Sequence, residues 1–273
     1  MEKSLSQPDD KKKSKTVSMF LPFETDYKTL KNWRITGLVF LYFASVLSIL
    51  IPLNETFLHS VAFRNILEFS NYIFIIFYFI INVVTETFIF PATSRARRLD
   101  FIDNSLGSKF LGDVSINNFS NDVVQIGTYK MAVNCFENCF FTYNISKGMM
   151  PQVITKNTIF TFIFLSTAYV GFKDNAFALP ILRVFLSSLF ITELIHHLNF
   201  VSKLKNLTER FKLIFMEKEK LSQNVLPHSI LLILEYETIL AYNKAPLSDR
   251  VYKKLSKQLT AKWEELKKYY EIV

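Results

Sequence analysis

Residues 35–53 read ITGLVFLYFASVLSILIPL, and this stretch of nineteen residues contains no charged side chain. A helix needs roughly 20 apolar residues to cross the hydrocarbon core of a bilayer. The stretch begins well inside the chain, and no small-residue cleavage site of a signal peptide follows it. We therefore predict that it is a membrane-spanning helix.

Three further apolar segments follow along the chain. Residues 69–85 read FSNYIFIIFYFIINVVT, again without a charge, and residues 157–172 read NTIFTFIFLSTAYVGF. Residues 176–200 are interrupted by Arg183 and Glu193 but are otherwise mainly apolar. None of these segments alternates between apolar and polar residues as a barrel strand does, so all are predicted to be helices.

The sequence thus predicts an all-α integral membrane protein with four transmembrane helices arranged as two hairpins. A cytoplasmic helical middle segment would join the hairpins, and a C-terminal helical region would follow them. The alternative is a protein with two spans, in which the third and fourth apolar segments form a buried hairpin of a water-soluble domain.

The positions of lysine and arginine predict the orientation. Eight lie in residues 1–34, seven in residues 92–156 and fourteen in residues 201–273, which is 29 of the 32 in the chain. The short loops of a membrane protein carry an excess of these residues on the cytoplasmic side. With four spans, all three basic segments fall on one side. The prediction is a multi-pass protein of the cell inner membrane with both termini in the cytoplasm.

These boundaries divide the chain into five parts. Residues 1–18 are polar, rich in lysine and predicted to be disordered. Residues 19–91 form the first hairpin, 92–156 the middle segment, 157–200 the second hairpin and 201–273 the C-terminal helices.

Helical spacing of apolar residues continues in the cytoplasmic parts. Residues 123–147 are predicted to form an amphipathic helix whose Phe136, Phe140 and Phe141 lie against the membrane or against the tail. Three helices are expected in the tail, separated before the last by a break at Pro246, with Ser248 as its N-cap. The predicted packing stripes are Leu204, Leu207, Phe211, Ile214 and Leu221 in the first, and Val251, Leu255, Leu259, Trp263, Leu266 and Tyr270 in the last.

The sequence contains no signature of enzymatic chemistry. It has no Walker loop, glycine-rich dinucleotide fingerprint, serine elbow or HExxH sequence, so we expect no enzyme and no cofactor. Cys135 and Cys139 are one helical turn apart, but no histidine cluster accompanies them, and we expect two buried thiols rather than a metal site. The net charge of +8 follows from the positive-inside pattern and requires no DNA or RNA duplex as a partner.

Ionisable residues in predicted spans are costly and are candidates for function. Glu86 lies near the inner end of the second span, and Glu193, His196 and His197 lie near the inner end of the fourth. Glu193 and His196 match half of a di-iron helix motif, but no second Glu-x-x-His lies in a span. We predict an interhelical polar cluster, structural or gating, and the alternative is that these side chains snorkel to the interface.

Two further sets of residues are candidates for function. Ser187, Ser188 and Thr192 give the fourth span a polar stripe that would line a pore between subunits, or else hydrogen-bond within the bundle. Lys203, Lys205, Arg210 and Lys212 follow the fourth span and would contact lipid phosphates or a phosphate-bearing messenger, or form a solvated face. Arg183 either snorkels outward or lines a pore.

One segment of the tail resembles a known family. Residues 234–265 read LEYETILAYNKAPLSDRVYKKLSKQLTAKWEE, and this resembles the end of the four-transmembrane effectors associated with SMODS nucleotidyltransferases. The matching residues are Asn243, Lys244, Pro246, Asp249, Tyr252 and Leu255. Residues 98–112 (RLDFIDNSLGSKFLG) occupy the place of a charged, Phe-Asp and Leu-Gly stretch in that family.

The resemblance implies a pore-forming effector of bacterial anti-phage defence. Such a protein would form a homo-oligomer in the lipid bilayer on activation by a cyclic or linear oligonucleotide messenger, and would permeabilise the inner membrane. The alternative is a non-enzymatic regulatory or scaffold membrane protein that binds a cytoplasmic partner through its C-terminal helices. A transporter is a weaker third option, since internal repeats and broken helices are not visible.

The charge asymmetry makes the topology testable by reporter fusions. Fusions at residue 120 and at the C-terminus are expected to report the cytoplasm, and fusions at residues 58 and 174 the periplasm, because this places 29 of the 32 basic residues inside. A periplasmic signal at residue 120 would contradict the four-span topology.

Overall fold

The structure is a computed structural model that describes residues 21–57, 60–112, 115, 119–171, 190–216, 226–243 and 247–272. In these residues it consists of helices and connecting turns, with no strand, which confirms the predicted all-α class. The helices are α1 (Glu24–Phe57), α2 (Val61–Val84), the π-helical turn η1 (Thr85–Ile89), α3 (Phe90–Leu106), α4 (Thr128–Gly171), α6 (Phe190–Met216), α7 (Leu226–Asn243) and α8 (Asp249–Tyr269).

The helices α2, η1 and α3 are continuous from Val61 to Leu106. Ser60 caps the start by accepting a hydrogen bond from the backbone N–H of Phe63, and Gly107 ends the helix at a φ of 70°, which favours glycine. Within the described residues, this is the one helix long and apolar enough to cross a membrane, and only 11% of its most apolar window is buried. Four spans were predicted, and this finding within the described residues accounts for one of them.

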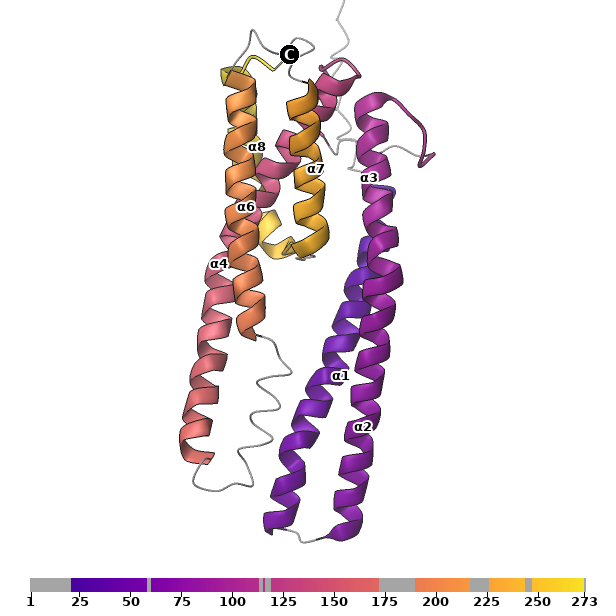
Figure 1. The fold of residues 1–273 in the computed structure, drawn as a ribbon, viewed down its shortest axis with the longest axis vertical. Coiled ribbons are helices and arrows are strands. Elements are labelled where there is room, and N and C mark those ends of the chain that lie inside the picture. The colour runs from indigo at the N-terminus through magenta and orange to yellow at the C-terminus, as the bar shows by residue number, and fades with distance from the viewer. Residues whose placement is uncertain are drawn as a thin grey trace, which may run out of the picture.

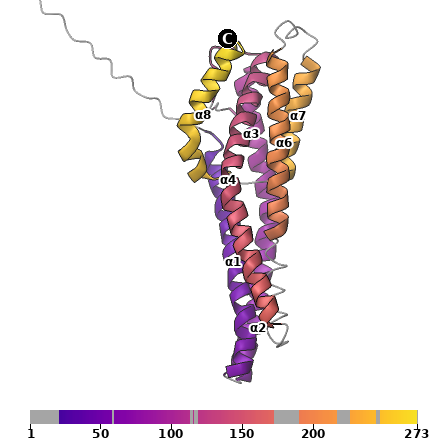
Figure 2. The same ribbon diagram turned by 90° about the vertical axis from the view of Figure 1, so that its left-hand side faces the viewer.

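The molecule has two halves of different character. Figures 1 and 2 show that α3, α6, α7, α8 and the start of α4 gather at one end, while α1, α2 and the rest of α4 continue to the other end. We name these the bundle half and the apolar half.

Aromatic side chains form the core of the bundle half. Phe136 of α4 stacks on Phe211 and Phe215 of α6, with ring centroids 5.6 and 5.3 Å away, and Trp263 of α8 meets its edge at 5.1 Å. All four side chains are at most 1% exposed. The ring centroid of Phe140 also lies 6.0 Å from that of Trp263. Phe136 and Phe140 therefore lie against the tail, which was one of the two predicted arrangements.

The apolar half leaves large hydrophobic side chains uncovered. Ile66, Phe79 and Phe162 are 62%, 64% and 70% exposed. Similar residues occur along all three helices of this half, including Leu38, Phe43, Val46, Phe69, Ile76, Ile80, Ile159 and Leu165. A surface of this kind is normally covered by lipid or by another protein.

The predicted part boundaries after residues 91, 156 and 200 fall inside continuous helices. The long helix Val61–Leu106 passes the first boundary, α4 the second and α6 the third. The reason is that side-chain polarity changes along a helix without interrupting its backbone hydrogen bonds.

The C-terminal helices follow the predicted pattern. Ser248 caps α8 by accepting a hydrogen bond from the N–H of Val251, as predicted. The predicted stripe residues are buried or partly buried in α6 and α8, except Leu221, which lies outside the described residues. Gly148 of α4 permits close approach, because a Cβ there would lie 2.9 Å from Leu255 and 3.0 Å from Val251.

The aromatic core predicts a large difference between two phenylalanine substitutions. Phe136→Ala leaves a cavity among the rings of Phe211, Phe215 and Trp263 and should lower the free energy of unfolding by about 3–5 kcal/mol. Phe110→Ala, at a side chain that is 69% exposed, is the matched control and should have a much smaller effect. SDS-induced unfolding in mixed micelles measures both. Equal losses would show that Phe136 is not central to the core.

Candidate functional site at the junction of the two halves

An ion pair closes the first hairpin where the apolar half begins. The Nη2 atom of Arg34 in α1 donates to Oε1 of Glu86 in η1 at 3.1 Å, and these side chains are 22% and 26% exposed. The guanidinium also lies 5.4 Å from the ring centre of Phe90. A π-helical turn is uncommon and is often found at functional sites, and this one places Glu86 beside Arg34.

A second ion pair joins the first hairpin to the bundle. Arg97 of α3 donates to the carboxylate of Glu237 in α7, and both side chains are 18% exposed. Burial alone would lower the pKa of Arg97, but the Glu237 carboxylate raises it on balance. Burial also raises the pKa of Tyr27 in α1, although the positive charge of Arg97 lowers it in part. Removing one member of such a pair would leave an uncompensated charge in a partly dry site.

The second pair of long helices has its own polar contacts. Lys156 of α4 donates to both carboxylate oxygens of Glu193 in α6 at 2.7 and 2.6 Å. These side chains are 42% and 48% exposed, so the pair adds little stability in water. His197 is buried, and its Nε2 lies 3.0 Å from the backbone oxygen of Ser146, while His196 is exposed.

The described contacts of the residues in the predicted polar cluster include partners on their own hairpins. Glu86 pairs with Arg34 in the first hairpin, whereas Glu193 pairs with Lys156 and His197 bonds Ser146 in the second. The cationic partners Arg34 and Lys156 were not predicted. The sequence contained a signal for these partners. Arg34 and Lys156 are each the last charged residue before an apolar segment, so each lies at the depth of the carboxylate on the neighbouring helix.

The candidate phosphate-binding residues are partly engaged with carboxylates. Arg210 pairs with Glu235 of α7, and Lys212 pairs with Glu209 at 2.8 Å. Lys203 and Lys205 are exposed, and Lys203 lines an open groove of about 460 Å³ between α6 and α7. Of the candidate pore-lining residues, Thr192 is exposed in α6, whereas Ser187, Ser188 and also Arg183 lie outside the described residues.

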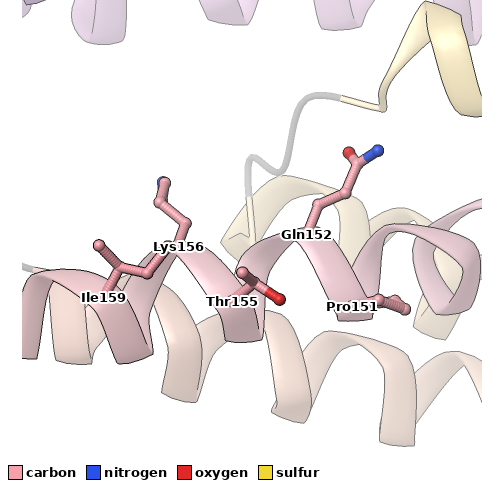
Figure 3. A pocket seen from close by; sticks show the side chains of 5 residues that line it. All are labelled: Pro151, Gln152, Thr155, Lys156 and Ile159. Atoms are coloured by element: carbon pink, nitrogen blue, oxygen red, sulfur yellow. The ribbon is translucent and has the colours of Figure 1, made fainter.

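A second open groove runs along α4 where the two halves meet. It has a volume of about 530 Å³ and is lined by Pro151, Gln152, Thr155, Lys156 and Ile159. Figure 3 shows these five side chains on successive turns of the helix, with Gln152 and Lys156 directed to the same side. Gln152, Thr155 and Lys156 are polar, whereas Ile159, one turn further along α4, is apolar. Side-chain polarity therefore changes along α4 at this groove.

Both cysteines are buried, as predicted. Cys135 and Cys139 are free thiols, and Sγ of Cys139 lies 3.3 Å from the hydroxyl of Thr208. Burial raises the pKa of Cys139 to about 12. The described residues contain no group of three or more metal-ligating side chains.

Residues 98–112 have a local structural role. Asp103 ends α3 by accepting hydrogen bonds from the backbone N–H groups of Phe110 and Leu111 at 2.9 and 2.8 Å. Asp100 accepts from the N–H and the hydroxyl of Ser115, both at 2.9 Å. Both carboxylates are buried and hold the turn that follows α3.

A buried polar network in the bundle half was not predicted. The carboxylate of Glu137 in α4 accepts hydrogen bonds from Asn121 at 2.7 Å and from the hydroxyl of Ser120 at 3.0 Å. Lys267 of α8 donates to the backbone oxygen of Ser120 at 2.7 Å. The network joins the loop before α4 to the C-terminal helix. Its residues are far apart in sequence, so no local pattern revealed it.

Comparisons with protein-family models, with curated proteins and with solved structures found no match to this chain. The family resemblance of the tail therefore stays an expectation from the quoted residues.

Glu137 should make stability depend on pH. Burial raises its pKa from 4.5 to about 7, despite the donors from Ser120 and Asn121 and the nearby Lys267. The folded state thus favours the protonated acid, so its contribution is complete below pH 4.5 and is lost as the pH rises through about 7. The loss is on the order of 3 kcal/mol.

Unfolding of the detergent-solubilised protein between pH 4.5 and 7.5 measures this dependence. Glu137→Gln should remove most of the downward slope, whereas Glu265→Gln, at an exposed position of α8, should keep it. An unchanged slope in Glu137→Gln would assign the pH dependence to other groups.

Proposed function

We propose that this chain is a membrane effector that inserts both hairpins into the inner membrane and permeabilises it as an oligomer after activation. The observation that carries the proposal is the continuity of the long helices. The helix Val61–Leu106 and helix α4 each run without a break from the exposed apolar half into the packed bundle half. A rearrangement of the bundle would therefore be transmitted along continuous helices into the bilayer.

The arrangement of the apolar half supports assembly between subunits. The first hairpin packs α1 against α2, and among the described residues it is joined to the bundle mainly through α3, which packs against α4. Figure 1 shows the far ends of α1 and α2 apart from that of α4. Their uncovered side chains, such as Phe79 and Phe162, are available to lipid in one state and to neighbouring subunits in another.

The proposed topology places the bundle half and both termini in the cytoplasm, with four spans. In this orientation the junction ion pairs lie near the inner surface of the membrane. Arg97–Glu237 links α3 to α7, so it joins the first hairpin to the helices that would sense an activating signal. A nucleotide messenger is the proposed signal because of the resemblance in the tail.

A second candidate is a scaffold that binds a cytoplasmic partner through its C-terminal helices. The observation in its favour is the exposed apolar face of α7, where Leu231 and Leu234 are 47% and 60% exposed. These residues border the groove that Lys203 and Glu235 also line. A scaffold would need this face, and it would not need to open the membrane.

Dye uptake separates the two functions. Cells that express the protein with its genomic neighbours should admit a membrane-impermeant dye after phage challenge and before lysis. Phe162→Arg places a charge in the apolar half, where it costs roughly 2.5–3.5 kcal/mol in a spanning helix, and should abolish uptake and protection. Phe110→Arg, exposed in the bundle half, should retain both. Dye exclusion in protected wild-type cells would favour the scaffold.

A further inference from the structure

The α7–α8 corner ends at the level where the apolar half begins. We use this name for the described residues Tyr242, Leu247, Arg250, Tyr252 and Lys253. Figures 1 and 2 show α7 and α8 ending partway down the molecule, while α1, α2 and α4 continue. The corner is thus the part of the C-terminal helices nearest to the proposed bilayer.

Contacts to two long helices fix the depth of the corner. Asp249 pairs with Lys31 of α1, and the N–H of Ser248 lies 3.3 Å from the sulfur of Met149 in α4. The exposed aliphatic side chains begin at Ile35 in α1 and at Ile154 in α4. Ile35 lies four residues beyond Lys31 in α1, and Ile154 lies five residues beyond Met149 in α4. At a rise of 1.5 Å per residue, these separations are about 6–8 Å along the helices.

That distance matches the headgroup layer. The hydrocarbon core of a bilayer is about 30 Å thick and the whole bilayer about 40–45 Å, so each headgroup layer is about 5–8 Å thick. Trp33, which is 39% exposed, lies between Lys31 and Ile35 at this same level. Tryptophan and tyrosine are enriched at that depth in membrane proteins.

Aromatic and apolar side chains of the corner are uncovered. Tyr242 is 78% exposed, Tyr252 40% and Leu247 39%. A tyrosine has an apolar ring and a polar hydroxyl, which suits a boundary between lipid and water.

The charge of α8 is also uneven along its length. Arg250, Lys253, Lys254 and Lys257 are exposed in its membrane-proximal part, and no salt bridge joins them to a described residue. The one acidic residue there, Asp249, is paired with Lys31. The acidic residues Glu264 and Glu265 lie in the distal part. The basic end therefore faces the side where lipid phosphates would lie.

We propose that the α7–α8 corner is a membrane-docking surface that rests on the cytoplasmic headgroup layer and prefers anionic lipids. Tyr242, Leu247 and Tyr252 insert among the headgroups, and Arg250 and Lys253 contact lipid phosphates. The bilayer rather than a second copy is the occupant because the corner has unbalanced positive charge, which two copies would repel. The inference rests on the bilayer insertion in the proposed function but does not require permeabilisation.

Fluorescence quenching in proteoliposomes tests the docking. Because Cys135 and Cys139 are buried, a cysteine added to the full chain can be labelled selectively with a polarity-sensitive fluorophore. Tyr242→Cys is the test position, and Tyr269→Cys, 67% exposed near the far end of α8, is the matched control. Phe162→Cys, in the apolar half, reports insertion itself.

Headgroup-labelled nitroxide lipid should quench position 242 several-fold more than position 269, and acyl-chain nitroxide lipid should quench position 162. Quenching at 162 with equal quenching at 242 and 269 would overturn the docking alone. No quenching at 162 would overturn both the docking and the insertion that it rests on. A blue-shifted label at 242 that headgroup nitroxides do not quench would show a protein contact and also overturn the docking.

A charge comparison tests the lipid preference. In phosphatidylcholine vesicles, adding phosphatidylglycerol should increase quenching at position 242. The double variant Arg250→Gln with Lys253→Gln should lose this increase, whereas Lys262→Gln with Lys268→Gln removes the same charge distally and should keep it. Free inorganic phosphate should not compete at equal concentration, because the site recognises a charged surface. Equal loss in both double variants would overturn the proposed contact of Arg250 and Lys253 with lipid phosphate.

Discussion

The structure depends on helices whose backbone hydrogen bonding continues while the polarity of their side chains changes. Within a helix each peptide group finds its partner locally, so the same helix can serve in lipid and in water. Val61–Leu106 and α4 are each uncovered along one half and packed along the other. The two halves of the molecule therefore share continuous helices, although their surfaces differ in polarity.

The two halves are held together by different interactions. In the bundle half, stacked rings around Phe136 bury apolar area and bring α4, α6 and α8 together. At the junction, charged pairs replace this packing. Arg97 and Glu237 are mostly buried and tie the first hairpin to α7. Breaking a buried ion pair leaves an unpaired buried charge, which is energetically costly. This contact therefore constrains how the hairpin and the bundle can move relative to each other.

The proposed functions differ in what they ask of this arrangement. An effector needs a bundle that changes state and helices that carry the change into the membrane. A scaffold needs an accessible cytoplasmic face and a fixed anchor. The uncovered side chains of the apolar half serve both, whereas the exposed Leu231 and Leu234 serve the scaffold more directly. Docking of the α7–α8 corner would add a second point of attachment in either case.

The sequence by itself determined the all-α class, the apolar segments, the cap at Ser248 and the packing stripes of α6 and α8, because these follow from the local spacing and polarity of residues. Only the tertiary structure decided that Arg34 pairs with Glu86, that Lys156 pairs with Glu193, and that Glu137 meets Ser120 and Asn121. It also decided that the predicted boundaries fall inside continuous helices. Partner choice depends on which helices pack together and at what depth, and helical periodicity fixes the face that a side chain occupies but not the neighbour that it meets.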